Sequence, residues 1–331
     1  MRIGLDAHGS ENIGGDVAGA VRASRQDLVG NGEIVLIGDR QIIFQQLEKL
    51  SWGSADHAQR LHVVNAPDII PMDMEGTEIL RREKSSIFVG ARMLKEHTLD
   101  AFCSAGNSST VVTAATMVTG RLPGVSRPGL AVGFPNAVGN KTILADLGAL
   151  KECKPEHLAQ LAIMADCYWR AEFSEDPPRI GLYNIGKEDT KGPKIIREAN
   201  TLMRAITLPG FNYIGFVEGN AILDGSCDVV ICDGVLGNGY LKAFEVLPVL
   251  IPVLLSQQGM EFDETELAEA LSGFNYERSG GVLCLGINGT VMITHGKASE
   301  LAIANMLARA SKLVNSTVND MIRAALASSS E

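Results

Sequence analysis

Short apolar segments alternate with helical patterns along nearly the whole chain, and polar turns follow many of them. The strand-like segments are 2–6, 33–38, 61–65, 101–104, 142–147, 179–185, 213–217 and 228–232. Parallel strands need a long crossover, which a helix commonly supplies, so this alternation favours a mostly parallel sheet. We therefore predict an α/β fold of three layers, with helices on both faces of the sheet.

The length permits one large domain or two smaller lobes, because 331 residues can bury a sizeable core. No internal repeat or linker divides the chain, and Phe173–Pro178 is expected to be a surface loop. We therefore expect a single domain over 1–331, with a protruding helical hairpin around 243–275. Two long helices are also expected, one from Thr77 to about His97 and one from about Ser299 onward.

The charge balance bears on the partners. The 29 basic and 39 acidic residues give a net charge of −10, which excludes nucleic acid as an expected partner. The six cysteines have no C-x-x-C spacing, which suits a reducing cytoplasm. No run approaches the ~18 apolar residues of a membrane span.

The stretch from Asp100 to Gly120 has the clearest local pattern. It predicts a buried strand, Ala101–Ser104, a tight turn through Gly106, and a helix capped by Asn107 or Ser108. Helix N-termini favour anions, and ligands of α/β sheets lie where strands end. The turn is either an ordinary capped turn or a cradle for a phosphate or carbonyl group.

Similar turns rich in glycine and amides follow other predicted strands. The turns are 104–109, 146–149, 184–192 and 233–238. The sequence has no G-x-S-x-G and no H-E-x-x-H pattern, so neither a serine nucleophile of that type nor a catalytic zinc is expected. A site of this composition suits a reaction whose nucleophile is a substrate, such as phosphate attacking a thioester.

Ordered blocks across the chain resemble the bacterial phosphate acyltransferases, which make acyl-phosphate from acyl-acyl-carrier protein in phospholipid synthesis. The blocks include Ile3–Ala7, Arg81–Ser86, Ser104–Asn107, Asp146–Ala149, Lys154–Leu158, Asn184–Gly186, Asp228–Gly234, Gly237–Lys242, Leu285–Gly289 and His295–Gly296. The resemblance implies a fold like that of isocitrate dehydrogenase and phosphotransacetylase.

The resemblance also implies roles for residues in these blocks. The catalytic candidates are Asp233, Asn238 and Lys242. The substrate-binding candidates are Ser104, Gly106, Asn107, Asn184, Gly186, Glu188, Gly234 and His295. We expect the acidic carrier protein to dock on Arg81, Arg82 and Lys84, at the start of a helix. For Lys242, Asp233 and His295 the alternatives are a solvated helix lysine, a helix-cap aspartate and a hydrogen-bonded strand-end histidine.

The implied reaction uses acyl-acyl-carrier protein and inorganic phosphate, with neither metal nor cofactor. A homodimer, weak contact with the inner face of the membrane and product transfer to a membrane glycerol-3-phosphate acyltransferase are also implied. The chain departs from the family pattern at Asp6–Glu11, Lys84, Leu150 and Lys187. A second hypothesis is therefore a non-catalytic relative that binds the carrier or a membrane and regulates lipid synthesis.

The segment Ala243–Leu255 is unusually apolar. An apolar helix is normally buried, so its first interpretation is a core or dimer-interface helix. Pro248 and Pro252 should break or kink it, and Gln257–Gly259 then turns the chain. The second interpretation is therefore the tip of a hairpin that contacts a membrane.

Overall fold

The computed structural model describes residues 1–53, 60–150, 152–173 and 176–328. The chain folds as two compact units. Unit 1 contains Met1–Leu122 and Tyr276–Asn319, and unit 2 contains Pro123–Asn275 and Asp320–Glu331. Each is an α/β unit with a mixed, mostly parallel sheet, which confirms the predicted fold class.

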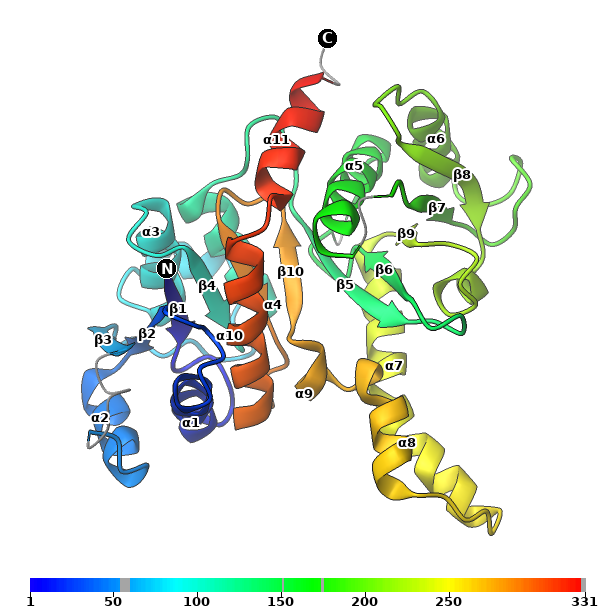
Figure 1. Cartoon of the computed structure of the whole chain (residues 1–331). Helices are drawn as coiled ribbons and strands as arrows, with labels where there is room; N and C mark the ends of the chain where they lie inside the picture. The colour runs from blue at the N-terminus through cyan, green and yellow to red at the C-terminus, as the bar shows by residue number, and fades with distance from the viewer. Residues whose placement is uncertain (54–59, 151, 174–175, 329–331) are drawn as a thin grey trace. The chain divides into compact units, whose positions relative to one another are not determined.

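The strands of unit 1 follow the order β3-β2-β1-β4-β11-β10 (Figure 1). Their bounds are β1 Arg2–Asp6, β2 Glu33–Gly38, β3 Leu61–Asn65, β4 Ala101–Ser104, β10 Val282–Leu285 and β11 Thr290–Ile293. All these neighbours are parallel except β10 and β11. Strands β10 and β11 therefore form a hairpin. Ile293 of β11 pairs with Ser104 of β4, so these two strands end side by side.

The helices of unit 1 pack in groups around this sheet. They are α1 Ile13–Arg25, α2 Arg40–Lys49, α3 Ser86–Lys95, α4 Ser108–Ala114, α9 Tyr276–Ser279 and α10 Glu300–Val314, with a 3-10 helix η2 Gly76–Arg81 and a π-helical turn η3 Ala115–Thr119. Helices α1 and α10 pack together, while η2 and η3 pack with α3 and α4. Buried aliphatic residues such as Ile3, Leu5 and Ile34 fill the space between sheet and helices.

The strands of unit 2 follow the order β5-β6-β9-β7-β8. Their bounds are β5 Gly129–Pro135, β6 Lys141–Ala145, β7 Arg179–Tyr183, β8 Asn212–Val217 and β9 Val229–Ile231. Only the β5–β6 pair among these is antiparallel. The helices are α5 Pro155–Glu172, α6 Lys194–Arg204, η4 Gly219–Ile222, α7 Gly234–Gln257, α8 Glu264–Ala270, η5 Ser272–Phe274 and α11 Val318–Ser328. Pro155 occupies the first turn of α5, where its missing amide donor costs nothing.

Two predicted long helices are wrong. The helix expected from Thr77 to His97 is divided into η2 and α3, because Ser85 leaves the helical conformation and caps α3 through the Phe88 amide. The helix expected from Ser299 onward ends at Val314, and α11 begins at Val318. In the second case Ser316 donates to the Leu313 carbonyl, a local bond of the kind that competes with helix continuation.

Pro248 and Pro252 were expected to break or kink this helix, and the break is wrong, since α7 continues from Gly234 to Gln257. Each proline removes only one amide donor, and the two prolines are four residues apart on one face, so hydrogen bonds on the other faces remain available. The α7–α8 hairpin extends from unit 2 (Figure 1). By length and composition alone α7 could cross a membrane, and 6% of its most apolar window is buried.

Candidate functional site

The turn after β4 in unit 1 has the predicted geometry. Asn107 is the N-cap of α4, and its Oδ1 accepts from the amides of Ser109 and Thr110. Its Nδ2 donates to the carbonyls of Met72 and Met74, at 2.7 and 2.9 Å. The Asn107 side chain therefore fixes the turn and joins it to the segment that precedes η2.

Ser104 is held by a buried carboxylate at the end of β1. Its Oγ donates to Asp6 Oδ2 at 2.7 Å and accepts from the Gly106 amide at 3.0 Å. Asp6 is fully buried and also interacts with the Ser86 hydroxyl at the start of α3. Burial raises the pKa of Asp6, while the Ser86 and Ser104 hydrogen bonds oppose that rise. Asp6 thus joins the ends of β1 and β4 to the start of α3.

The first glycine-containing loop lies directly on this turn. A Cβ on Gly9 would be 2.7 Å from Asp6 Oδ2 and 2.9 Å from the Gly106 amide nitrogen, so only glycine fits there. His8 Nε2 accepts from the Asp39 amide, and burial lowers the His8 pKa. That hydrogen bond and the lowered pKa both favour a neutral imidazole.

His295 follows the strand that neighbours β4 in unit 1. His295 follows β11, whose last residue pairs with Ser104, and its Nδ1 accepts from the Lys297 amide at 3.0 Å. The structure therefore brings His295 to the strand edge that carries Ser104, Gly106 and Asn107.

The three basic residues lie between two helices, not at the start of one. Arg81 ends η2, while Arg82 and Lys84 precede α3. Arg82 is 3.6 Å from Asp68, whereas the side chains of Arg81 and Lys84 are exposed.

The corresponding edge of unit 2 is built around Asp146, at the end of β6. This buried carboxylate accepts from the amides of Leu130 and Leu147, both at 2.7 Å, and from the Leu150 amide. Burial raises its pKa, and these amides oppose the rise. A Cβ on Gly237 would be 1.8 Å from the Asp146 carbonyl oxygen. Helix α7 can therefore start against this turn only because glycine faces it.

Asp233 follows β9 and is the N-cap of α7. Its Oδ1 accepts from the Val235 and Leu236 amides, at 2.9 and 3.0 Å, and the Gly234 amide donates to the Leu150 carbonyl. Asn238 and Lys242 are exposed one helical turn apart. Lys242 Nζ donates to Glu245 Oε2 at 2.7 Å. Asp233 and Lys242 thus have the interactions of a helix cap and a surface lysine, while sharing one end of α7.

Asn184 follows β7, which is adjacent to β9. Its Nδ2 donates to the Lys191 carbonyl at 3.1 Å and so closes the loop 184–192. Its Oδ1 is buried without a hydrogen-bond partner in the described structure, and a Cβ on Gly192 would be 1.9 Å from it. In the same loop Gly186 is buried and Glu188 is exposed. Asn184, Asp233 and Asp146 therefore follow three neighbouring strands of unit 2.

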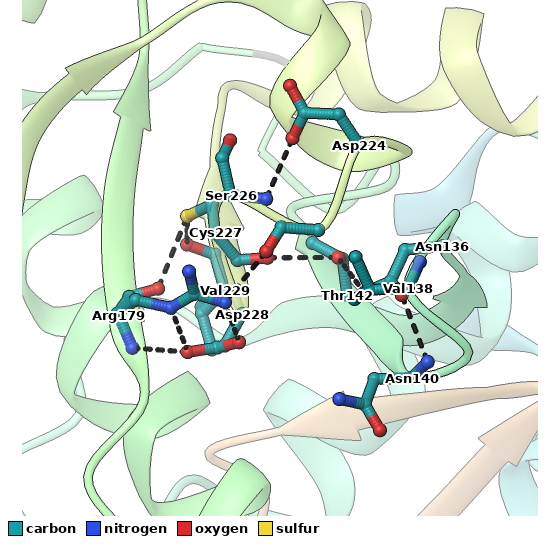
Figure 2. Close-up of polar contacts among 11 residues, drawn as sticks. Asn136, Val138, Asn140, Thr142, Arg179, Asp224, Ser226, Cys227, Asp228 and Val229 are labelled. Carbon is teal, nitrogen blue, oxygen red and sulfur yellow. Dashed lines mark hydrogen bonds and ion pairs between the residues drawn. The ribbon is translucent and has the colours of Figure 1, made fainter.

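A separate polar cluster lies at the opposite ends of these strands (Figure 2). Arg179 Nε and Nη2 donate to the two carboxylate oxygens of Asp228, at 2.9 and 2.8 Å. Thr142 Oγ1 donates to the Cys227 carbonyl at 3.0 Å and accepts from Asn136 Nδ2. These contacts fasten the beginnings of β6, β7 and β9. Asp228, part of the Asp228–Gly234 block, therefore has a structural role.

The nucleophile is not an evident side chain. Cys153 is partly buried, and burial and Asp233 raise its pKa, which disfavours the thiolate. Among the described residues, no group of three or more His, Cys, Asp or Glu side chains could hold a metal ion. The strand edge of unit 1 offers amides and hydroxyls, and that of unit 2 offers amides and Lys242. Groups of either kind are suited to binding an anion and stabilising an oxyanion.

Comparison with known proteins identifies the family. Residues 1–321 match the family described as "Fatty acid synthesis protein". The phosphate acyltransferase of Chlorobaculum parvum is 36% identical over 98% of this chain and 99% of its own, and that of Petrotoga mobilis is 34% identical over 93% and 94%. The chain belongs to the phosphate acyltransferase family. It is therefore an acyltransferase by family, and transfer of an acyl group to phosphate is the family's reaction.

Solved structures support the fold. A phosphotransacetylase from Streptococcus pyogenes has a TM-score of 0.62 at 16% identity, covering 95% of this chain and 94% of its own. The EutD phosphotransacetylase from Staphylococcus aureus has the same TM-score at 15% identity. These similarities confirm the expected phosphotransacetylase-like fold.

Two residues that organise the candidate site were not assigned roles from the sequence. Asp6 and Asp146 are fully buried and hold the strand-end turns. Each is an aspartate that directly follows an apolar strand segment. A carboxylate in such a place needs internal donors, and that requirement is the signal that could have identified both residues.

Proposed function

We propose that this protein transfers a fatty acyl group from an acyl-acyl-carrier-protein thioester to inorganic phosphate, giving acyl-phosphate for phospholipid synthesis. A phosphate oxygen attacks the thioester carbonyl, the tetrahedral oxyanion collapses, and the carrier thiolate leaves and takes a proton. The full-length family match carries the proposal. The amide-rich turns support it, because they offer hydrogen-bond donors to an anion and an oxyanion. They offer no evident side-chain nucleophile, and in this reaction phosphate is the nucleophile.

In this proposal the start of α7 is catalytic. Lys242 Nζ exchanges Glu245 for phosphate or the developing oxyanion, and Asn238, on the same exposed face, donates to the same group. Asp233 uses Oδ1 as the helix cap, so Oδ2 is the oxygen that orients these groups or exchanges a proton.

The remaining candidate residues would bind substrate through the shape of their loops. Hydrogen bonds within each unit already fix the side chains of Ser104, Asn107 and Asn184. Their proposed contribution is therefore to position backbone amides. The proposed binding loops of unit 1 also contain Gly106 and His295. Those of unit 2 contain Gly186, Glu188 and Gly234.

Lys242→Ala is expected to lower the rate of acyl-phosphate formation at least about tenfold, because one positioned charge is lost from the transition state. The assay combines purified protein, long-chain acyl-carrier protein and phosphate, and measures acyl-phosphate and free carrier thiol. Lys95→Ala, at an exposed position on α3, is the matched control.

A smaller loss would remove Lys242 from the catalytic site. If wild type binds the acylated carrier but forms neither product, the reaction is disproved. The protein would then be a non-catalytic relative that regulates lipid synthesis.

We further propose that the acidic carrier protein docks on Arg81 and Lys84, whose exposed side chains flank Arg82. Because the whole chain has a charge of −10, attraction must come from a local patch. Arg81→Glu with Lys84→Glu should raise the KM for the carrier substrate severalfold and flatten its salt dependence. Lys49→Glu with Lys95→Glu provides the same charge change elsewhere in unit 1. Equal effects from the two double variants would place the docking surface elsewhere.

We propose that the protein is a cytoplasmic homodimer that makes weak contact with the inner face of the membrane. The observation that favours these contacts is the outer stripe of α7, formed by Val246, Leu250 and Leu254, which are 51%, 42% and 49% exposed. Such a stripe marks an interaction surface. It would let acyl-phosphate pass to a membrane glycerol-3-phosphate acyltransferase.

A further inference from the structure

An apolar groove lies between α7 and α8 of unit 2. It has a volume of about 550 Å³, within the range of small-molecule sites. Its lining includes Pro248, Pro252, Val253, Phe262, Leu267 and Ala268. Pro248 and Pro252 of α7 face the groove. The outer stripe, at positions 246, 250 and 254, lies on a different face of the helix.

The groove lies on the face of α7 that carries the proposed catalytic residues. Spacings of four, seven, eleven, fourteen and eighteen residues return to nearly the same side of a helix with 3.6 residues per turn, so one face carries Asn238, Lys242, Val249, Pro252 and Ser256. Pro252 and Ser256 line the groove. One face of α7 therefore leads from the proposed reaction site to the groove.

The length and charge of this face identify the ligand that it fits. From Lys242 to Ser256 the helix rises about 21 Å at 1.5 Å per residue, comparable with an extended long-chain acyl group. Residues 243–275 contain no Lys or Arg, while their acidic residues are Glu245, Glu261, Asp263, Glu264, Glu266 and Glu269. An anionic headgroup would be repelled there, whereas an uncharged hydrocarbon chain would not.

We propose that the α7–α8 groove binds the distal hydrocarbon of the fatty acyl substrate and so sets the preferred chain length. The inference rests on the proposed acyl transfer. The acyl carbonyl remains near Asn238 and Lys242, and the chain runs past exposed Val249 on the same face of α7 into the groove. Each methylene that enters the groove removes apolar surface from water, so affinity increases with chain length until the groove is full.

Ala268→Trp tests the groove, because Ala268 lines it from α8 and a tryptophan side chain would occupy the space. Ala270→Trp is the matched control, an identical change at an exposed α8 position that does not line the groove. The ligands are C16 and C6 acyl thioethers of carrier protein, which cannot react with phosphate. Calorimetric titration gives their affinities, and turnover of the corresponding thioesters is measured in parallel.

We expect Ala268→Trp to weaken C16 binding about tenfold or more while C6 binding stays unchanged, and Ala270→Trp to change neither. Ser256→Trp, which lines the groove from α7, should reproduce the C16 effect if Ala268→Trp does not fold. Unchanged C16 binding in both groove variants, or equal weakening of C16 and C6, would overturn the inference.

Other occupants of the groove give different results. If Ala268→Trp changes only the sedimentation of the protein alone, a second copy covers the groove and the inference fails. The same holds if it abolishes only cosedimentation with phosphatidylcholine vesicles, because the occupant is then a bilayer. Groove-dependent C16 binding without acyl-phosphate formation would reject the proposed reaction while leaving the groove assignment intact.

Discussion

Gly237→Ala is expected to destabilise unit 2 by about 4 kcal/mol or more, enough to prevent accumulation of folded protein. The added Cβ would lie 1.8 Å from the Asp146 carbonyl oxygen and 3.0 Å from Cys232 Sγ. The closest of these atoms is backbone at the end of β6, so a side-chain rotation cannot relieve the overlap. Either α7 moves off the turn, or the turn loses the hydrogen bonds that Asp146 accepts from Leu130 and Leu147.

Gly239→Ala provides the matched control, two residues further along α7. A Cβ there meets no atom within 4 Å, and replacing a helical glycine with alanine usually stabilises by about 0.5–1 kcal/mol. Urea unfolding of both variants checks the prediction. If Gly237→Ala unfolds at the wild-type midpoint, the close approach of α7 to the Asp146 turn is wrong.

Residues that act locally were predictable from the sequence. Asn107 caps α4 as predicted, and Pro155 begins α5, because capping and proline geometry depend on a few adjacent residues. The α/β class also followed from alternation alone. The turns after β4, β6, β7 and β9 were placed correctly for the same reason.

Features decided by distant residues were not predictable. The tight start of α7 depends on Gly237 meeting Asp146, which is 91 positions earlier. The Asp6–Ser104 hydrogen bond likewise joins residues 98 positions apart. The local rule for proline suggested that Pro248 would interrupt α7, yet the helix continues. The α7–α8 groove also depends on how the chain returns after Gly259, which no local pattern specifies.

Asp6→Ala is expected to lower the stability of the protein by about 2–4 kcal/mol, because three buried donors lose their acceptor. The donors are the Ser104 hydroxyl, the Ser86 hydroxyl and the His8 amide. Removing a buried carboxyl also relieves its desolvation, which offsets part of the loss. Acyl transfer, if the proposed function holds, should fall about a hundredfold or more, since the Ser104–Asn107 turn loses its anchor.

Asp6→Asn separates the hydrogen bonds from the charge. Burial raises the pKa of Asp6, so the folded state holds this proton more tightly than the unfolded state does. The stability it contributes is complete below the unfolded pKa of about 3.9 and is lost as pH rises through the folded pKa. Asparagine keeps an acceptor for Ser104 but has no proton to lose. Its stability should therefore decline less than that of wild type as the pH rises above about 4. Asp16, whose pKa burial raises in the same direction, leaves a residual slope in both proteins. Urea unfolding across this range measures the two slopes. Equal slopes, together with wild-type activity in Asp6→Ala, would show that Asp6 neither holds the turn nor retains its proton on folding.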